Sequence, residues 1–355
     1  MPKRIAILWT SLSGFMDSCI NALESKGASV FFAYQRKMNG NAPYDHTRFG
    51  FNAETYGWDE ELSAENLRNA IEKFKPDVII AAGWGIPGYR KVLTEFRARV
   101  PRVICMDNQW RGTLKQYVAV FTRKMFFNRL CDAVWVPGER QVRFANRLGY
   151  TAERILQGMY TCESARFSPG EAVISRDRKF LFVGRYVSSK GISTLAKAYA
   201  EYRATVNNPW PLECAGSGPM RDTLVAVSGI TVHDFIQPED LPRLFLNSTC
   251  FISTSLFEPW GVVIHEAAVS GLVILATSEV GASVHLVRDS VNGFLFRPGD
   301  QEHLVRLMVR ISSATDAELE AMSRASRLLG AQYSPTTWAS TLYSRFPDLQ
   351  AACRS

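Results

Sequence analysis

Short hydrophobic runs alternate with longer amphipathic segments along most of the 355-residue chain. The short runs are rich in Val, Ile, Leu and Phe, which is typical of strands that are buried on both faces. Amphipathic segments of helical periodicity separate most of them, and this alternation predicts parallel sheets covered by helices. We expect strands at Arg4–Leu8, Val30–Tyr34, Asp77–Ala81, Arg102–Met106, Ala133–Val136, Phe180–Val183, Leu212–Ala215, Ile230–His233, Cys250–Ser253, Val273–Ala276 and Gly293–Phe296.

The strands fall into two series, and each series predicts one doubly wound, Rossmann-like α/β domain, because right-handed crossovers join parallel strands. Turn residues and weak periodicity mark a boundary within QGMYTCESARFSPGEA, which begins at Gln157. We therefore predict a first domain over residues 1–165 and a second over residues 166–334, followed by a helix at Pro335–Phe346. Ligands of open α/β sheets bind at the carboxyl ends of the strands, so the loops there are the candidate sites.

Positive charge is concentrated in the first domain. The whole chain carries a formal net charge of +7, yet the stretch from Trp84 to Tyr150 alone holds thirteen Lys and Arg against four acidic residues. This excess indicates an anionic partner: phospholipid headgroups, an acidic or phosphorylated acceptor, or nucleic acid. No nucleic-acid-binding module accompanies the charge, so we do not expect nucleic acid.

The seven cysteines are scattered, and no pair has CxxC spacing, so neither a disulfide framework nor a zinc site is indicated. The five histidines lack metal-ligand spacing as well, and we expect no metal. The first apolar run is too short for a signal peptide, and no apolar run is long enough to cross a membrane. These features favour a cytoplasmic protein, either free or peripheral on the cytoplasmic face of the membrane.

The most specific candidate site is SLFEPWGVVIHEAAVSG at Ser255–Gly271, which follows a predicted strand. Gly261 permits a close backbone approach, and a helix from Val262 would present free N–H groups to an anion such as a diphosphate. Glu258 and Glu266 are eight positions apart, about 12 Å along a helix, so they are unlike the paired carboxylates that flank one glycosidic bond. We infer that Glu258 holds sugar hydroxyls and Glu266 holds ribose hydroxyls. The alternative is an exposed Glu and a Glu in the first turn of the helix, where the helix dipole favours a negative charge.

Two further loops carry candidate phosphate contacts. FLFVGRYVSSKG at Phe180–Gly191 runs from a strand through a glycine turn to Arg185 and Lys190, which suit bidentate and point-charge recognition of phosphate. In LECAGSGP, Gly216 begins a GxG turn without the third glycine of a dinucleotide fingerprint, so we expect a tight loop near a nucleotide. Solvated side chains and a plain strand-to-helix turn are the respective alternatives.

The first domain offers weaker signals. Gly14 follows the first strand, where its backbone either approaches a phosphate or sugar or simply forms a turn. DNQWR follows another strand, and its Trp110 either stacks on a sugar ring or packs against neighbouring side chains. The acceptor-side candidates are Asn108, Gln109, Trp110 and Arg111.

The segment Arg111–Leu130 combines apolar residues at helical spacing with interspersed Lys and Arg. This pattern is typical of a basic amphipathic helix that lies on an anionic membrane. A core helix with a solvated basic face shows the same pattern, and we favour the core helix here.

The motifs FVGRYVSSKG, CAGSGP, FEPWGVVIHEAAVSG and VNGFLFRPGD, in this order over about residues 180–300, resemble glycosyltransferase family 4. The resemblance implies a GT-B fold of two Rossmann-like domains that face a cleft, with a C-terminal helix at about residues 335–355 packed back on the first domain. It also implies a retaining hexosyltransferase that moves a sugar from a UDP- or GDP-sugar to a hydroxyl of a glycan, lipid-linked or small-molecule acceptor, without a metal or other cofactor.

By the family's pattern, Arg185 and Lys190 grip the donor diphosphate, Glu258 contacts the transferred sugar, and Glu266 holds the nucleotide ribose. Backbone amides around Trp260–Val262 approach the sugar and the phosphate. Glu258, Arg185 and Lys190 are the catalytic candidates. The expected donor-binding residues are Gly14, Gly184, Arg185, Lys190, Gly216, Glu258, Trp260, Gly261, Val262 and Glu266.

The chain departs from the family's pattern in two places. Many relatives carry a His in the first-domain loop that reads DNQWR here, so Asn108, Gln109 or a backbone carbonyl would take its place. Ile236 and Gln237 replace the family's glycine after the strand near Phe235, which leaves base recognition unassigned. The alternative functions are a catalytically inactive nucleotide-sugar-binding subunit and a GT-B-fold nucleotide-sugar epimerase.

Overall fold

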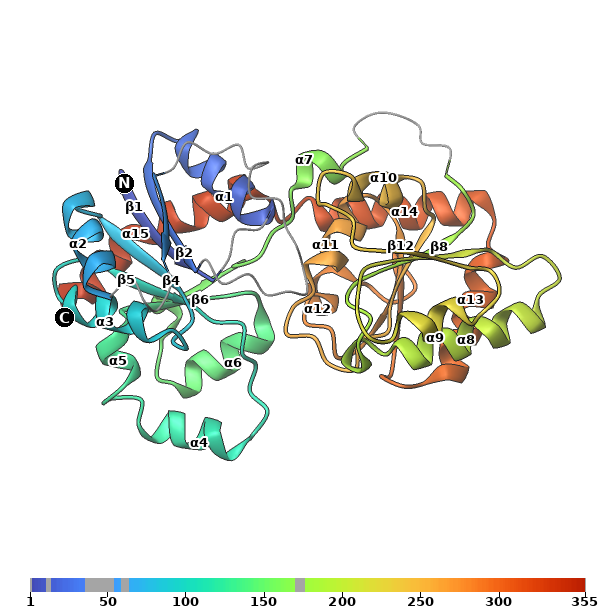
Figure 1. Cartoon of the computed structure of the whole chain (residues 1–355), viewed down its shortest axis with the longest axis horizontal. Helices are drawn as coiled ribbons and strands as arrows, with labels where there is room; N and C mark the ends of the chain where they lie inside the picture. The colour runs from blue at the N-terminus through green and yellow to red at the C-terminus, as the bar shows by residue number, and fades with distance from the viewer. Residues whose placement is uncertain (1, 11–13, 36–53, 59–63, 170–175, 355) are drawn as a thin grey trace. The chain divides into compact units, whose positions relative to one another are not determined.

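The computed structural model describes residues 2–10, 14–35, 54–58, 64–169 and 176–354 (Figure 1). These residues form two compact units. Of the described residues, those up to Thr161 and those from Pro335 onward form the first unit, and those from Cys162 to Ser334 form the second. The sequence predicted a boundary at position 165, and the observed division lies a few residues before it.

A seven-stranded parallel sheet forms the centre of the first unit, in the order β3-β2-β1-β4-β5-β6-β7. The chain order reverses direction at the β1–β4 pair, which is therefore the switch point of a Rossmann-like sheet. The strands are β1 (Arg4–Trp9), β2 (Ser29–Gln35), β3 (Glu54–Trp58), β4 (Val78–Ala82), β5 (Arg102–Cys105), β6 (Ala133–Val136) and β7 (Ile155–Gln157).

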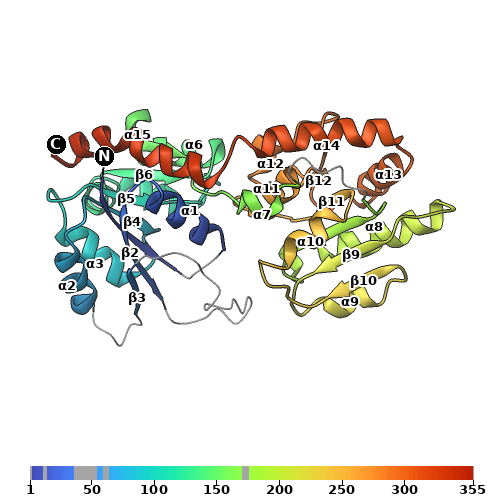
Figure 2. The same ribbon diagram turned by 90° about the horizontal axis from the view of Figure 1, so that it is seen from above.

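Helices cover both faces of this sheet. Side chains of successive β1 residues point to opposite faces, so Ile5 and Ile7 join one hydrophobic cluster while Ala6 and Leu8 join another. The first cluster includes residues of α1 (Gly14–Glu24) and α15 (Pro335–Arg354), which lie side by side (Figures 1 and 2). The second cluster includes residues of α2 (Ala64–Phe74), α3 (Pro87–Glu95), α5 (Phe127–Leu130) and α6 (Glu139–Arg147).

The last helix, α15, is held on the first unit by stacked indole rings. The ring of Trp338 lies 4.4 Å from that of Trp135, centroid to centroid, and the two rings are nearly parallel. The indole N–H of Trp338 donates a hydrogen bond of 2.9 Å to the carbonyl oxygen of Met159. The end of the chain is thus part of the core of the first unit.

The second unit contains a six-stranded parallel sheet in the order β10-β9-β8-β11-β12-β13, with its switch point between β8 and β11. Its strands are β8 (Phe180–Val183), β9 (Leu212–Ala215), β10 (Ile230–His233), β11 (Cys250–Ser253), β12 (Val273–Thr277) and β13 (Gly293–Phe296). Its helices are α7 (Ser164–Phe167), α8 (Ile192–Thr205), α9 (Arg221–Val225), α10 (Leu241–Leu246), α11 (Val262–Val269), α12 (Ser283–Leu286), α13 (Gln301–Ser312) and α14 (Asp316–Gly330).

The structure confirms every strand expected from the hydrophobic runs, and the helix expected from Pro335 extends to Arg354. Two strands were missed, β3 and β7, and both lie at the edges of the first sheet. The sequence of β3, ETYGW, contains Glu and Gly, and β7 is only three residues long. An edge strand pairs on one side only, so it needs neither the length nor the continuous apolar character by which central strands are recognised.

All seven cysteines are buried free thiols. None of the helices in the described ranges combines the length and the apolar character that a membrane span requires.

Candidate active site

The switch point of the second sheet brings together two of the loops singled out in the sequence. Because β8 pairs directly with β11, the loop that leaves β8 lies beside the loop that leaves β11. These are the loops that carry Arg185 and Lys190 on one side and Glu258 on the other. A crevice at the switch point is where open α/β sheets bind their ligands.

The two loops are joined through their backbones. The hydroxyl of Thr254 donates to the carbonyl oxygen of Lys190 over 2.8 Å, and the amide of Leu256 donates to the carbonyl oxygen of Ser189, also over 2.8 Å. Gly191 has a left-handed φ of 68°, and a Cβ at this position would lie 2.1 Å from the carbonyl oxygen of Thr254. Glycine is therefore required for the loops to approach this closely.

Lys190 and Glu258 form an ion pair across this junction. The ammonium group of Lys190 donates to Oε2 of Glu258, and the two side chains are only 17% and 20% exposed. The sequence motifs indicate a diphosphate for Lys190 and a sugar for Glu258, but not that the two groups contact each other. A cation and a carboxylate are thereby held together beside the carboxyl ends of β8 and β11, where a charged ligand can replace either partner.

The Glu258 loop is also joined to the loop after β12. The amide of Glu258 donates to Glu279 over 3.2 Å, the amide of Gly281 donates back to Glu258 over 3.0 Å, and the amide of Ala282 donates to Trp260 over 2.8 Å. These bonds hold the backbone of Glu258–Trp260 on both sides, so the position of the carboxylate is set by tertiary contacts rather than by its own turn.

Helix α11 begins directly after this loop with an uncapped N-terminus. Its N-cap is Gly261, whose φ of 90° and ψ of 76° are left-handed and which has no side chain to accept from the first N–H groups. A Cβ at this position would lie 3.2 Å from Cγ of Glu258, so the glycine also leaves room for that side chain. The N–H groups of the first turn and the helix dipole make this end suitable for an anion.

Arg185 supplies a further cation in the loop after β8. Its side chain is exposed, and within the described part of the chain its guanidinium has no hydrogen-bond or ion-pair partner. It differs in this respect from Lys190, which is already paired. An unpaired guanidinium at a switch point is available for bidentate recognition of phosphate.

Glu266 lies on α11, one turn beyond its start, and has an unusual charge state. Burial, followed by the nearby negative charge of Glu163, raises the pKa of Glu266 from 4.5 to about 8. Glu163 is itself paired with Arg166 at 2.9 Å. The carboxyl group of Glu266 is therefore mostly protonated at neutral pH, in which state it both donates and accepts hydrogen bonds.

His265 is a structural residue that the sequence analysis considered only as a metal ligand. Its Nδ1 accepts from the amide of Cys162 over 3.0 Å, and its Nε2 lies 2.9 Å from the carbonyl oxygen of Gly330. The amide can only donate and the carbonyl only accept, so the ring is a neutral Nε2–H tautomer; burial lowers its pKa to about 4. His265 thus ties α11 to the start of the unit and to the end of α14.

The glycines of the β8 and β9 loops pack directly against each other. A Cβ at Gly216 would lie 2.0 Å from the carbonyl oxygen of Gly184, and the amide of Tyr186 donates to the carbonyl oxygen of Ser217 over 2.7 Å. The expected tight loop is present. The need for Gly216 is explained by this contact between loops, and its place in a donor site stays a prediction.

The first-unit candidates lie at the carboxyl ends of their own strands. Gly14 is the first residue of α1. Asn108 and Arg111 are exposed, whereas Gln109 is buried and its carbonyl oxygen accepts from the side-chain amide of Gln116 over 2.7 Å. Their assignment to an acceptor stays a prediction.

Trp110 packs within its own unit. Its ring contacts Phe144 at 5.8 Å and Tyr117 at 5.0 Å between centroids, and the guanidinium of Arg147 lies 4.3 Å from its centre. The ring remains half-buried, but its neighbours account for much of its surface. Packing, the alternative stated for Trp110, is therefore observed.

No group of three or more His, Cys, Asp or Glu side chains that suits a metal ion occurs in the ranges that the structure describes.

The second unit has a recognisable family signature. Residues 165–328 match the family model of glycosyl transferases group 1, and this range contains both switch-point loops and all of α11. This part of the second unit is thus similar to glycosyl transferases group 1. This agrees with the resemblance drawn from the motifs, at a coarser level than family 4.

Individual relatives of this domain are distant. The chain is 27% identical over 158 residues to an uncharacterized glycosyltransferase of Methanocaldococcus jannaschii, a match that covers 42% of this chain and 40% of that protein. The match thus spans less than half the length of that curated relative.

Solved structures match over nearly the whole chain. Sucrose-phosphate synthase of Thermosynechococcus elongatus has a TM-score of 0.73 at 18% identity and covers 99% of this chain and 100% of that one. The Anabaena protein HepE, in complex with UDP-glucose, has a TM-score of 0.72 at 16% identity and covers 97% of this chain and 99% of that one. At such identities the likeness establishes the fold, which is the GT-B fold of two Rossmann-like units.

Proposed function

We propose that this chain is a retaining glycosyltransferase that moves a hexosyl group from a nucleotide diphosphate sugar to an acceptor hydroxyl. The observation that carries the proposal is the meeting of Lys190, Glu258 and the uncapped start of α11 at the switch point of a glycosyl transferases group 1 domain. Cation, carboxylate and helix N-terminus are the groups that a sugar diphosphate needs within one crevice.

The donor diphosphate is expected to replace Glu258 as the partner of Lys190. The ammonium gains two negatively charged oxygens, and the released carboxylate turns to the hydroxyls of the sugar. Arg185, which has no partner in the described part of the chain, adds a bidentate contact, and the first N–H groups of α11 add a third source of positive potential. These groups stabilise the charge that develops on the leaving diphosphate.

A nucleoside diphosphate of the UDP or GDP type is the expected leaving group. HepE of Anabaena has been solved with UDP-glucose, and its fold matches this chain over almost its whole length, which supports a nucleotide sugar of this kind. We assign the ribose hydroxyls to Glu266, because a protonated carboxyl group accepts from one hydroxyl and donates to the other.

In the proposed reaction the acceptor oxygen forms a bond to the anomeric carbon on the face from which the diphosphate departs. The bond between that carbon and the phosphate oxygen breaks, and the proton of the acceptor hydroxyl passes to the departing phosphate. We assign Glu258 to the sugar hydroxyls rather than to a general base, so the departing phosphate is the group that accepts the proton of the acceptor. We expect the reaction to proceed without a metal, so transfer activity should persist after treatment with EDTA.

A panel of UDP, GDP and their sugars in a thermal-shift experiment identifies the donor, because a ligand that binds only the folded state raises its melting temperature. Transfer is then followed with the stabilising donor, and the anomeric configuration of the product is read by NMR. Release of free sugar from the donor in the absence of acceptor supports catalysis, whereas donor binding without any turnover indicates an inactive binding subunit. Conversion of the donor to an epimer indicates an epimerase.

The Arg185→Ala variant tests the assignment of the site. The Arg185 side chain is exposed and unpaired among the described residues, so its removal should leave the fold unaffected. We expect the rate of sugar transfer to fall about 10²-fold, because the leaving diphosphate loses a charged partner. Arg306→Ala is the matched control, since it removes an exposed arginine from α13 of the same unit. Equal turnover of the Arg185 and Arg306 variants would overturn the proposed site.

A further inference from the structure

Helix α4 (Leu114–Phe121) presents its apolar stripe to solvent. Leu114, Tyr117, Val118 and Phe121 recur at intervals of three and four residues, and each is more than half exposed, up to 88% for Phe121. Met125, in the turn that follows, continues the stripe and is 71% exposed. A stripe with this spacing ordinarily faces a core. The core helix that we favoured for Arg111–Leu130 is therefore wrong over α4, which has no buried residue, although Phe127 and Leu130 of the following α5 are buried.

The opposite face of α4 fixes its orientation. Ala119 and Val120 are partly buried against the hydrophobic core of the first unit. Gln116 ties down the start of the helix, because its side chain accepts from the amide of Arg111 over 2.8 Å and donates to the carbonyl oxygen of Gln109 over 2.7 Å. Small residues and a polar anchor thus face inward, and the large apolar residues face outward.

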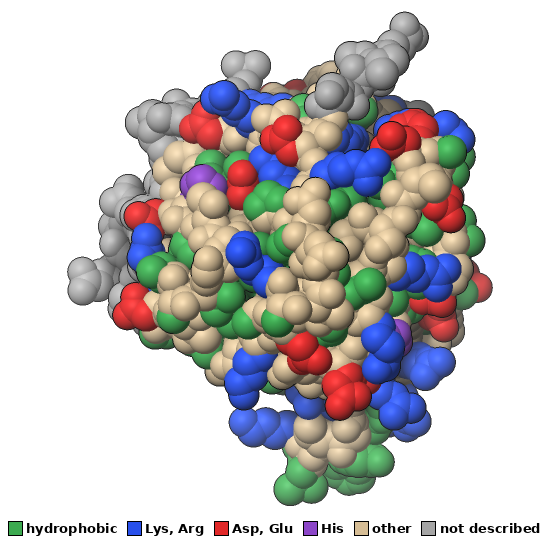
Figure 3. Space-filling view, turned by 90° about the vertical axis from the view of Figure 1, so that its right-hand side faces the viewer, with side chains coloured by type: hydrophobic (Ala, Val, Ile, Leu, Met, Phe, Trp, Pro, Cys, Tyr) green, Lys and Arg blue, Asp and Glu red, His purple; other side chains and the backbone are tan. Residues whose placement is uncertain are grey.

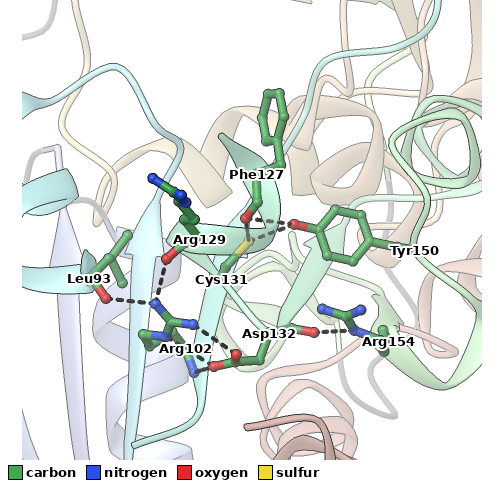
Figure 4. A network of polar contacts seen from close by, with 8 residues as sticks. All are labelled: Leu93, Arg102, Phe127, Arg129, Cys131, Asp132, Tyr150 and Arg154. Atoms are coloured by element: carbon green, nitrogen blue, oxygen red, sulfur yellow. Dashed lines mark hydrogen bonds and ion pairs between the residues drawn. The ribbon is translucent and has the colours of Figure 1, made fainter. Parts of the chain in front are cut away.

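A buried polar network fixes the other end of the segment (Figure 4). The guanidinium of Arg102, which is almost fully buried, bonds both oxygens of Asp132 at 2.8 and 3.0 Å and donates to the carbonyl oxygen of Arg129 over 2.7 Å. The Sγ of Cys131 lies 2.9 Å from the hydroxyl of Tyr150. Because both ends are anchored, the outward direction of the stripe is a property of the fold.

Positive charge surrounds the apolar stripe. Residues 111–130 contain five Lys and Arg and no acidic residue. We define the α4 surface by its exposed apolar residues Leu114, Tyr117, Val118, Phe121 and Met125 together with the exposed cations Arg111, Lys115, Lys124 and Arg129. Figure 3 shows hydrophobic side chains gathered at the lower end of the view, with Lys and Arg side chains near them, and Figure 1 places α4 at that end.

We propose that the α4 surface binds the surface of an anionic phospholipid bilayer. The apolar stripe, which includes Phe121 and Tyr117, enters the boundary between headgroups and acyl chains, and the cations bind lipid phosphates. A second copy of the chain fits poorly, because a symmetric contact would bring two sets of cations together. This surface belongs to the first unit, whereas the proposed donor site belongs to the second.

Co-sedimentation of the full chain with vesicles tests the proposal. Phosphatidylcholine vesicles are compared with vesicles that also contain phosphatidylglycerol. We expect binding to the anionic vesicles only, with a loss of binding as the salt concentration rises. A wild-type chain that stays unbound on anionic vesicles, or that binds both kinds equally, would overturn the proposal; the first result would leave an acidic protein as the occupant.

Two double variants separate the apolar and electrostatic contributions. One variant combines Leu114→Gln with Phe121→Gln, and the other combines Lys115→Gln with Lys124→Gln. Each should weaken binding to the anionic vesicles at least tenfold, since each basic residue near the membrane surface contributes about a fivefold factor to the affinity. All four side chains are exposed, so thermal stability should not change.

The matched controls lie in the second unit. Leu328→Gln removes an apolar side chain that is 73% exposed on α14, and Lys197→Gln removes an exposed cation from α8. Both should bind vesicles like the wild type. If they weaken binding as much as the α4 variants do, or if the chain forms a dimer that Phe121→Gln dissociates, the proposal fails.

Discussion

Neutralising Glu266 should make the protein more stable at alkaline pH. The pKa of Glu266 is raised from 4.5 to about 8, first by burial and second by the charge of Glu163. The folded chain therefore binds this proton more tightly than the unfolded chain. The resulting stabilisation is full below about pH 4.5 and is lost as the pH rises through about 8.

The size of the expected stability difference follows from the shift in the pKa of Glu266. About 3.5 pKa units correspond to about 5 kcal/mol for a carboxylate that is fully excluded from solvent. Part of the Glu266 side chain reaches solvent, so we expect about 2 kcal/mol at pH 9. For a unit of this size, 2 kcal/mol changes the melting temperature by about 4–8 °C.

Differential scanning calorimetry of the wild type and Glu266→Gln between pH 5.5 and 9 measures this effect. The glutamine resembles the protonated carboxyl group, so the two proteins should melt at similar temperatures at pH 5.5, and the variant should melt about 4–8 °C higher at pH 9. Glu302→Gln, on exposed α13 surface, is the control and should show no such widening. A melting difference that is the same at both pH values would refute the reasoning, as would an NMR titration of Glu266 with a midpoint near 4.5.

Two further substitutions test the packing that positions these sites. Gly191→Ala should destabilise the second unit by about 2–4 kcal/mol, because the added Cβ would lie 2.1 Å from a backbone carbonyl oxygen. Gly299 has a similar φ of 78°, but an added Cβ there would meet no atom within 4 Å, so Gly299→Ala should cost only about 1 kcal/mol. Equal losses in thermal melting would contradict a steric cause. Asp132→Ala should lower the free energy of unfolding by about 3–5 kcal/mol, since it leaves the buried guanidinium of Arg102 without its counter-charge. Glu72→Ala, at an exposed ion pair in the same unit, should lower it by at most about 1 kcal/mol, and calorimetry measures both.

The donor-side candidates were readable from the sequence because each lies in a short motif directly after a strand. FEPWG and GRYVSSKG place polar residues and glycines where a parallel sheet ends, and that position depends only on local order along the chain. The left-handed backbone at Gly261 and Gly191 explains why glycine occupies these two positions. The strand pattern succeeded for the same reason, and it failed at β3 and β7, where edge pairing tolerates short or polar segments.

The roles of other residues depended on contacts that no motif contains. His265 looks like any helical histidine in the sequence, yet its two ring nitrogens bond backbone groups that are 103 and 65 residues away. The raised pKa of Glu266 depends likewise on burial and on Glu163, which lies in another segment. A pKa is set by the whole surroundings of a group, so spacing alone cannot predict it.

The sequence by itself determined that the chain forms two parallel α/β units, because continuous apolar runs separated by amphipathic segments can bury both faces of a strand only within such sheets. Only the tertiary structure decided that Lys190 contacts Glu258, 68 residues away, because that contact depends on β8 pairing with β11. It alone also decided that the stripe of α4 faces solvent. Helical periodicity identifies two faces of a helix, but which face is covered depends on the segments that pack against it.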